Sequence, residues 1–216
     1  MPLSSSTLSV ADKRVVVFKV GGSLLDRSGL ATCLRELAEQ RSDSVPLLTV
    51  GGGGAADLVR QWQPLHGLSD EQAHWLAIDA VGFNETLLQN LLPELRLVRS
   101  GSQLAAAGRE NAWPLVCAPC FLRWGEAQGF EPLPRSWDVT SDSIAAWIAR
   151  IMGADELILL KSRPLESKTS ADSAVFAGLV DRHFPGKAAL LPRVSWVNAR
   201  AEPLRIEPWL RAGQPV

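Results

Sequence analysis

The chain has 216 residues, a net charge of −1 and a hydrophobic fraction of 46%. This length and composition suffice for the core of one large globular domain, and the near-neutral charge argues against nucleic acid or an anionic membrane surface as the main partner. No signal peptide and no apolar run of membrane-spanning length is recognised, and the three cysteines lack a scaffold-like spacing, so we expect a soluble cytoplasmic protein.

Segments with strand and helix character alternate along the sequence. We expect a flexible, serine-rich lead-in over residues 1–13 and a single domain over residues 14–216. The expected strands are 15–20, 46–50, 95–98, 113–118, 157–160 and 194–198, with 121–124 either extending or following the fourth. The expected helices are 30–41, 55–63, 69–92, 104–107, 143–152 and 174–182. This alternation predicts an α/β fold with a mostly parallel sheet covered by helices on both faces.

Two glycine-rich loops each follow an apolar strand and lead into helical sequence. The first is Gly21-Gly22-Ser23, and the second comprises the four glycines 51–54. Backbone N–H groups at such strand-to-helix turns bind anions, phosphate above all. Lys19 adds a mobile positive charge of the kind that phosphoryl transfer requires, although a solvated lysine at a strand end is the alternative. Together the loops predict a site for two facing anionic groups.

Other interpretations of the glycines have less support. The second loop fits the loose dinucleotide pattern G-x-G-x-x-A, but the acidic residues 70–71 that follow it stand at a helix start rather than at the end of a strand. A tight turn without a ligand would not need four glycines, because each costs chain entropy. The P-loop pattern is absent, since no serine or threonine follows Lys187.

A third cluster covers residues 138–146. Thr140 and Ser141 offer hydroxyl and N–H groups at a predicted helix N-terminus, where the carboxylate of Asp142 suits the helix dipole. Capping alone would account for these residue types. In the functional interpretation, Asp142 orients the lysines while Thr140 and Ser141 contact phosphate.

The order of these motifs resembles the amino acid kinase family, which includes acetylglutamate, aspartate and bacterial uridylate kinases. The matching motifs are Lys19 to Ser23, the glycines 51–54 with Arg60, and residues 140–146, and the resemblance spans roughly residues 15–200. It implies a three-layer α/β/α sandwich with a mostly parallel central sheet. ATP and an acceptor would lie across the carboxyl edge of that sheet, with Mg²⁺ bridging ATP oxygens.

The resemblance implies a donor side, an acceptor side and a catalytic group between them. The donor side would comprise Gly21, Gly22, Ser23 and Lys161. The catalytic group would comprise Lys19, Asp142 and Lys161, with Asp142 holding the two lysines and Lys187 as the second choice for the role of Lys161. The acceptor side would comprise Gly52, Gly53, Gly54, Arg60, His74, Thr140 and Ser141.

The acceptor is the least defined part of this hypothesis. Arg60 would bind a phosphate on the acceptor, unless it is an ordinary surface arginine. The stretches 67–78, 178–181 and 184–185 are similar to archaeal uridylate-kinase-related proteins that phosphorylate aminomethylfuran phosphate in methanofuran synthesis. This likeness implies that His74 faces the acceptor. A histidine packed in the core or in a subunit interface would explain its position in the helix equally well.

We therefore expect an ATP-dependent kinase that transfers the γ-phosphoryl group to a small anionic acceptor. A phosphate, aminomethylfuran phosphate-like or nucleoside monophosphate-like, is favoured over a carboxylate. A member that binds an anion or metabolite without turnover is the alternative, because residues 161–167 replace the family's usual Asp-Val-Asp-Gly-like loop. We expect a homodimer or higher homo-oligomer that forms through the helix 69–92. We expect no nucleic-acid partner, no membrane association and no metal ion held by protein side chains.

Cys117 and Cys120 form a C-x-x-C pattern. A zinc site would need two further ligands, and the three histidines show no paired spacing. A redox pair of this type opens a helix, whereas these cysteines are expected to end a strand. We therefore predict a structural role for both.

Overall fold

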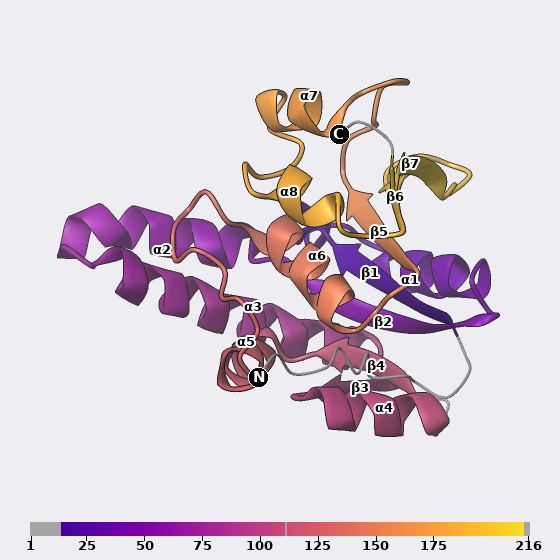
Figure 1. Cartoon of the computed structure of the whole chain (residues 1–216), viewed down its shortest axis with the longest axis horizontal. Helices are drawn as coiled ribbons and strands as arrows, with labels where there is room; N and C mark the ends of the chain where they lie inside the picture. Colours follow the sequence, from indigo (N-terminus) through magenta and orange to yellow (C-terminus); the bar gives the residue numbers. More distant parts are fainter. Residues whose placement is uncertain (1–13, 111, 214–216) are drawn as a thin grey trace.

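A seven-stranded sheet runs through the centre of the structure (Figure 1). The computed structural model describes residues 14–110 and 112–213, so the flexible lead-in expected over 1–13 lies outside the described residues. The strands are β1 (Arg14–Val20), β2 (Ser44–Val50), β3 (Leu95–Val98), β4 (Trp113–Val116), β5 (Glu156–Lys161), β6 (Arg193–Asn198) and β7 (Glu207–Arg211). Their order is β3-β4-β2-β1-β5-β6-β7, and every neighbouring pair is parallel except β6 with β7.

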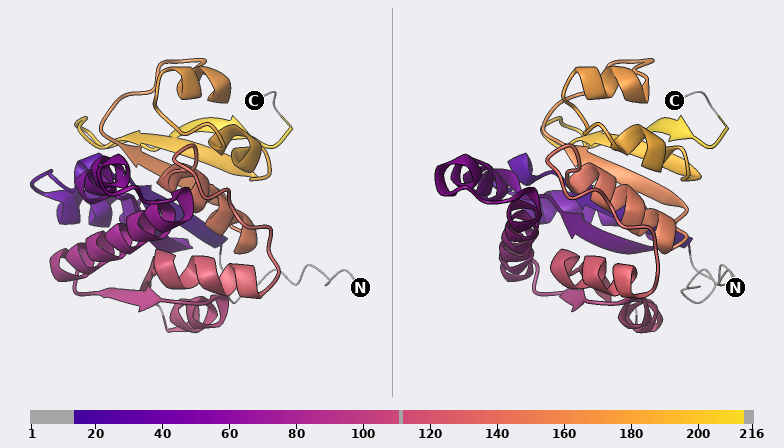
Figure 2. Two further views of the ribbon diagram at one scale, coloured as in Figure 1. Left: turned by 90° about the vertical axis from the view of Figure 1, so that its left-hand side faces the viewer. Right: turned by 60° about the vertical axis from the view of Figure 1, so that its left-hand side comes forward.

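Helices cover both faces of this sheet (Figure 2). They are the 3₁₀ helix η1 (Gly22–Leu24), α1 (Leu30–Glu39), α2 (Gly53–His66), α3 (Asp70–Leu91), α4 (Gly101–Arg109), α5 (Ala118–Ala127), α6 (Ser141–Ile151), α7 (Ala171–Phe176) and α8 (Phe184–Ala188). One core contains apolar side chains of α4 to α8, and the other contains those of α1 and the second half of α3. The predicted three-layer α/β/α sandwich is confirmed.

Strand β1 shows why the sheet forms at this place in the sequence. Val15 and Val17 belong to the core beneath α6, whereas Val16, Phe18 and Val20 belong to the core beneath α1. Alternate residues of a strand point to opposite faces, so a strand buried on both faces requires a continuous apolar run. The same alternation places Lys19 on the α6 face.

Helix α3 begins where the sequence predicts. Ser69 caps it by accepting a hydrogen bond from the backbone N–H of Gln72, and the Gln72 side chain accepts one from the N–H of Ser69 in return. This reciprocal capping box satisfies two N–H groups that the helix cannot satisfy itself. Helix α3 and the shorter α2 pack against each other and extend beyond the sheet (Figure 1).

Three expectations for local structure were wrong. Residues 121–124 are helical, because Pro119 suits the first turn of α5 and a short apolar run does not distinguish a buried helix from a strand. Cys117 and Cys120 therefore open a helix. The helix expected over 174–182 is α7, which ends at Phe176, just before the left-handed Gly178. Helix α8 and strand β7 were not predicted.

Candidate active site

The two glycine loops meet at the carboxyl edge of the sheet. Their strands, β1 and β2, are parallel neighbours, so their ends lie side by side. A Cβ atom on Gly22 would lie 2.1 Å from the backbone nitrogen of Gly53, and Gly53 itself has a left-handed φ of 48°. Only glycine allows this contact of backbone with backbone, which is why both loops are rich in it.

Lys19, Asp142 and Lys161 form a cluster behind these loops. Lys19 Nζ lies 2.8 Å from Asp142 Oδ1, and Lys161 Nζ lies 2.7 Å from Asp142 Oδ2. Lys161 Nζ also donates a hydrogen bond to the backbone carbonyl of Leu179 at 2.7 Å. Only 3% of Lys19 and 4% of Asp142 is exposed. The three residues assigned to catalysis by sequence thus come together, with two positive charges on one carboxylate.

Burial and mutual attraction set the ionisation of this cluster. Burial acts to raise the pKa of Asp142, but Lys19 and Lys161 outweigh it and hold the pKa below its usual value. Burial, reinforced by repulsion from Lys19, lowers the pKa of Lys161 to about 8 despite the attraction of Asp142. At neutral pH the cluster therefore carries a net positive charge next to two anion-binding loops.

Asp181 holds the turn that leads into α6, although the sequence did not single it out as a site residue. Its carboxylate accepts hydrogen bonds from the backbone N–H groups of Thr140 and Ser143, each at 3.0 Å, and from the Thr140 hydroxyl at 2.8 Å. The N–H groups of His183 and Phe184 donate to it as well. Asp181 thus positions the start of α6 and, with it, Asp142.

Asn84 holds the second loop in a comparable way. Its Nδ2 atom donates to the carbonyl oxygens of Gly51 and Gly52, both at 2.8 Å, and the residue is buried. With both carbonyls turned toward α3, the loop has a fixed conformation. Asn84 lies more than 30 residues from the loop, and no local pattern marks it.

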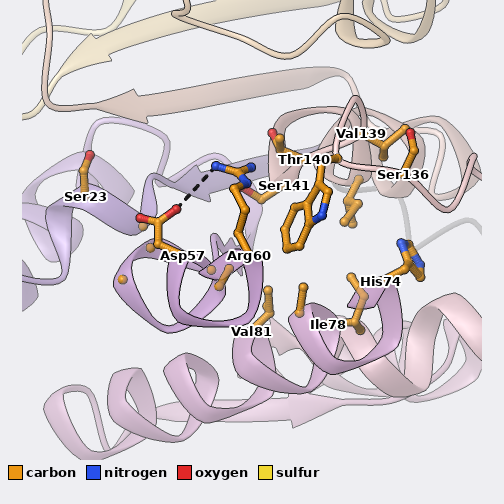
Figure 3. A pocket seen from close by; sticks show the side chains of 18 of the residues that line it. Ser23, Asp57, Arg60, His74, Ile78, Val81, Ser136, Val139, Thr140 and Ser141 are labelled. Atoms are coloured by element: carbon orange, nitrogen blue, oxygen red, sulfur yellow. Dashed lines mark ion pairs between the residues drawn. The ribbon is translucent and has the colours of Figure 1, made fainter. Parts of the chain in front are cut away.

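A cavity of about 430 Å³ opens in front of the two loops (Figure 3). It is lined by most of the residues that the sequence analysis assigned to phosphate or acceptor: Gly22, Ser23, Gly52, Gly53, Gly54, Arg60, His74, Thr140 and Ser141. Apolar side chains of α3 and α6 form part of its wall: Ala77, Ile78, Val81 and Ile144. Four assigned residues are not part of the lining: Lys19, Gly21, Asp142 and Lys161. Gly21 and Asp142 are sequence neighbours of the lining residues Gly22 and Ser141, and both lysines pair with Asp142.

Arg60 is held over an aromatic ring at the cavity wall. Its guanidinium carbon lies 4.6 Å from the centre of the Trp137 ring, and its Nη1 lies 3.5 Å from Asp57 Oδ1. In Figure 3 the side chain extends from α2 toward Thr140 and Ser141. Stacking leaves the guanidinium N–H groups that do not face Asp57 available for a planar or tetrahedral oxyanion.

His74 lines the cavity at a distance from the glycine loops. Burial, with the nearby charge of Arg135, lowers its pKa below the usual value, so the ring is neutral at pH 7. Its ring packs edge-on against Trp75, with 5.3 Å between centroids. His74 can therefore exchange hydrogen bonds with an acceptor but supplies no positive charge.

Ser23 and Lys187 complete the set of predicted residues. The hydroxyls of Ser23 and Ser162 lie 3.0 Å apart, which links the first loop to the segment after β5. Lys187 lies on α8, with its Nζ 3.7 Å from Glu131 Oε2 and away from the cluster. Lys161 rather than Lys187 is thus the second lysine of the cluster.

The polar groups present suit phosphate better than a bare metal ion. The bare backbone of Gly22 and Gly53, next to the Lys19 cluster, is a cradle that any side chain would fill. Among residues 14–110 and 112–213, no group of three or more His, Cys, Asp or Glu residues is arranged to hold a metal. A divalent cation here would therefore take most of its ligands from phosphate oxygens and water.

Comparison with known proteins relates this chain to a family of kinases. The family model described as "Amino acid kinase family" matches residues 14–164. No curated protein matches the chain. In the part of the chain that the structure describes, no helix is long and apolar enough to cross a membrane.

Three solved structures illustrate the likeness. UMP kinase from Ureaplasma parvum is 12% identical with a TM-score of 0.62, covering 89% of this chain and 92% of its own. UMP kinase from Bacillus anthracis is 15% identical, with a TM-score of 0.58 and coverages of 88% and 89%. Aspartate kinase from Synechocystis is 15% identical, with a TM-score of 0.60, and covers 92% of this chain but 41% of its own. At these identities the likeness shows a shared fold.

Proposed function

Because the chain belongs to the amino acid kinase family and is a kinase phosphotransferase, we propose that it transfers the γ-phosphoryl group of ATP to a small acceptor that already carries a phosphate. The observation that carries this proposal is the position of Arg60 in the cavity wall, in front of two facing glycine loops. One loop would receive the donor phosphates, and the other loop with Arg60 would receive the acceptor phosphate.

On the donor side, the chain supplies backbone N–H groups and buried positive charge. Gly21, Gly22 and Ser23 would hold the transferring phosphates, and Lys19 and Lys161 would offset the charge that develops during transfer. Asp142 keeps both ammonium groups in place before substrates bind. ATP use is implied by the family, generally with Mg²⁺, which would supply further charge neutralisation on the phosphate oxygens.

On the acceptor side, the cavity combines an apolar wall with carboxylates. Ile78, Val81 and Ile144 suit a compact ring, and Asp70 lines the same cavity as His74. A carboxylate near a neutral imidazole favours an acceptor with a cationic amine at the end opposite its phosphate. These features support an aminomethylfuran phosphate-like acceptor over a nucleoside monophosphate and over a carboxylate.

An ATP-consumption screen tests this proposal. The panel would contain aminomethylfuran phosphate, UMP, aspartate and acetylglutamate, with Mg²⁺ present, and the product would be identified by mass spectrometry. We expect turnover with a phosphorylated acceptor and its loss in Lys19→Ala. Turnover only with a carboxylate would contradict the proposed acceptor, and absence of both turnover and Mg·ATP binding by calorimetry would contradict the kinase activity.

We also propose a homo-oligomer that uses helix α3. Its residues Leu76, Phe83 and Leu91 are 37%, 69% and 41% exposed, whereas Ile78 and Val81 are in the core. Exposed apolar side chains of this size along one helix are typical of an interface. Light scattering of Phe83→Glu should show a smaller particle than the parent. The control is Phe176→Glu, which changes the 97% exposed residue of α7 and should leave the mass unchanged.

A further inference from the structure

Cys117 and Cys120 stand at the start of a ten-residue helix. Cys117 is the N-cap of α5, Pro119 lies in its first turn, and Cys120 follows in the same turn. Cys117 is buried and Cys120 is half-buried. Residues three apart at the start of a helix are neighbours on its surface. The two cysteine side chains are therefore neighbours at the first turn of α5.

A buried carboxyl group from another helix completes this arrangement. Glu85 of α3 is 2% exposed, and its Oε1 accepts a hydrogen bond from the N–H of Ala118 at 2.6 Å. Cys117 directly precedes Ala118, and its thiol is close enough to Glu85 to influence the pKa of that carboxyl group. A carboxyl so deeply buried is costly unless it is partnered, and its hydrogen-bond partner here is the first N–H group of α5, next to Cys117.

Burial raises the pKa of Glu85 to about 7, although the hydrogen bond from Ala118, the nearby Cys117 thiol and the charge of Arg99 act in the opposite direction. Burial also raises the pKa of Cys117, with Cys120 and Glu85 adding to the effect. A buried thiol with a high pKa needs a base beside it before it can react. Glu85 is such a base, since it can accept a proton near neutral pH.

We infer that Cys117 and Cys120 form a reversible disulfide, with Glu85 as the proton acceptor for the Cys117 thiol. The oxidant is a low-molecular-weight disulfide, R–S–S–R. The more accessible Cys120 thiolate attacks it, forms a mixed disulfide and releases one thiolate. Cys117 then loses its proton to Glu85 and attacks the sulfur of Cys120, which closes the internal disulfide and releases the second thiolate. Two protein thiols are oxidised, and one external disulfide is reduced to two thiols.

Oxidation of the Cys117–Cys120 pair uses none of the substrates of phosphoryl transfer. Neither cysteine lines the cavity in front of the glycine loops, and Cys33, the third cysteine, is buried in the core beneath α1. Thiol counting therefore reports on this pair without an activity assay.

The test equilibrates the full chain with buffers of increasing ratio of oxidised to reduced glutathione. After acid quenching, free thiols are alkylated and each cysteine peptide is assigned by mass spectrometry. We expect the free thiols of Cys117 and Cys120 to disappear together, with the two residues joined by a disulfide, while Cys33 is still alkylated as a free thiol. Cys117→Ser should stop at a mixed disulfide of Cys120 with glutathione. Free Cys117 and Cys120 at every ratio, or a bond from either to Cys33, would overturn the inference.

Glu85→Gln tests the proton acceptor, because glutamine still accepts the hydrogen bond from Ala118 but takes no proton. Closure of the disulfide at pH 7 should slow on the order of 10²-fold, and the rise of its rate near pH 7 should disappear. Glu94→Gln, which changes an exposed carboxylate paired with Arg35, is the control and should close at the parent rate. An unchanged rate and pH profile in Glu85→Gln would remove Glu85 from the proposal.

Discussion

Lys19 and Lys161 extend from neighbouring parallel strands to opposite oxygens of one buried carboxylate. The register explains this meeting. Lys19 pairs with Leu159, two residues before Lys161, so both lysines point to the same face of the sheet. Helix α6 covers that face and supplies Asp142 from its first turn. Strand register and helix position together concentrate positive charge where the glycine loops end.

Asp142→Asn should destabilise the fold strongly. The substitution leaves two buried ammonium groups without an anion, and loss of one partner of a buried pair costs about 3–5 kcal/mol. Urea unfolding at neutral pH measures the change, with the exposed Asp79→Asn of α3 as a control that should stay within about 0.5 kcal/mol of the parent.

The pH dependence of the difference in unfolding free energy between the parent and Asp142→Asn provides a second test. Because the folded-state pKa of Asp142 is lowered, the carboxylate stabilises the fold above the ordinary value of 3.8. This stabilisation is lost as the pH falls through the lower folded-state pKa. The unfolding free energies of parent and variant should therefore converge only in strong acid. Convergence already near neutral pH would contradict this ionisation.

Activity should fall as the pH rises through about 8, the pKa to which burial and Lys19 lower Lys161. Loss of the Lys161 proton removes a charge that offsets the transferring phosphate. Lys161→Arg keeps a permanent charge, so the alkaline decline of kcat should move to higher pH. Lys161→Met should lower kcat by about 10²- to 10³-fold. Steady-state assays on both sides of pH 8 check this, and an identical alkaline limb in Lys161→Arg would assign the decline to another group.

Much of the site follows from the sequence because its parts are local. Each glycine loop directly follows its strand, and parallel strands place their carboxyl ends at one edge of the sheet. Thr140, Ser141 and Asp142 were recognisable as a helix start. These patterns need no knowledge of tertiary contacts, and the residues assigned from them were brought together at one place.

The residues that hold these parts in place were not predictable in the same way. Asp181 contacts Thr140 from 41 residues away, and Asn84 contacts Gly51 from 33 residues away. Both are ordinary polar residues in sequence, and only the packing of α3 and the segment before α8 gives them their partners. The start of α5 at Cys117 was missed because a short apolar run is compatible with strand and helix alike.

Gly22→Ala should separate the two loops. The added Cβ would lie 2.1 Å from the backbone nitrogen of Gly53, and backbone on both sides leaves no flexible side chain to move. We expect a loss of about 1–3 kcal/mol in unfolding free energy, together with a large loss of kcat/KM. Gly186→Ala in α8 is the control, because its Cβ meets nothing within 4 Å. Equal stability of both variants would show that the loops do not need this close approach.

Arg60→Gln should weaken binding of a phosphorylated acceptor with little effect on kcat. The guanidinium lies over Trp137 in the cavity wall, and a hydrogen bond from a charged group contributes about 1.5–3 kcal/mol, so KM for the acceptor should rise about 10- to 100-fold. KM for ATP should stay the same. Arg123→Gln is the matched control, because Arg123 also lies over a tryptophan, Trp75, at 4.3 Å but does not line the cavity. If both variants raise the acceptor KM equally, the effect is one of general surface charge, and the phosphate of the acceptor must be bound elsewhere.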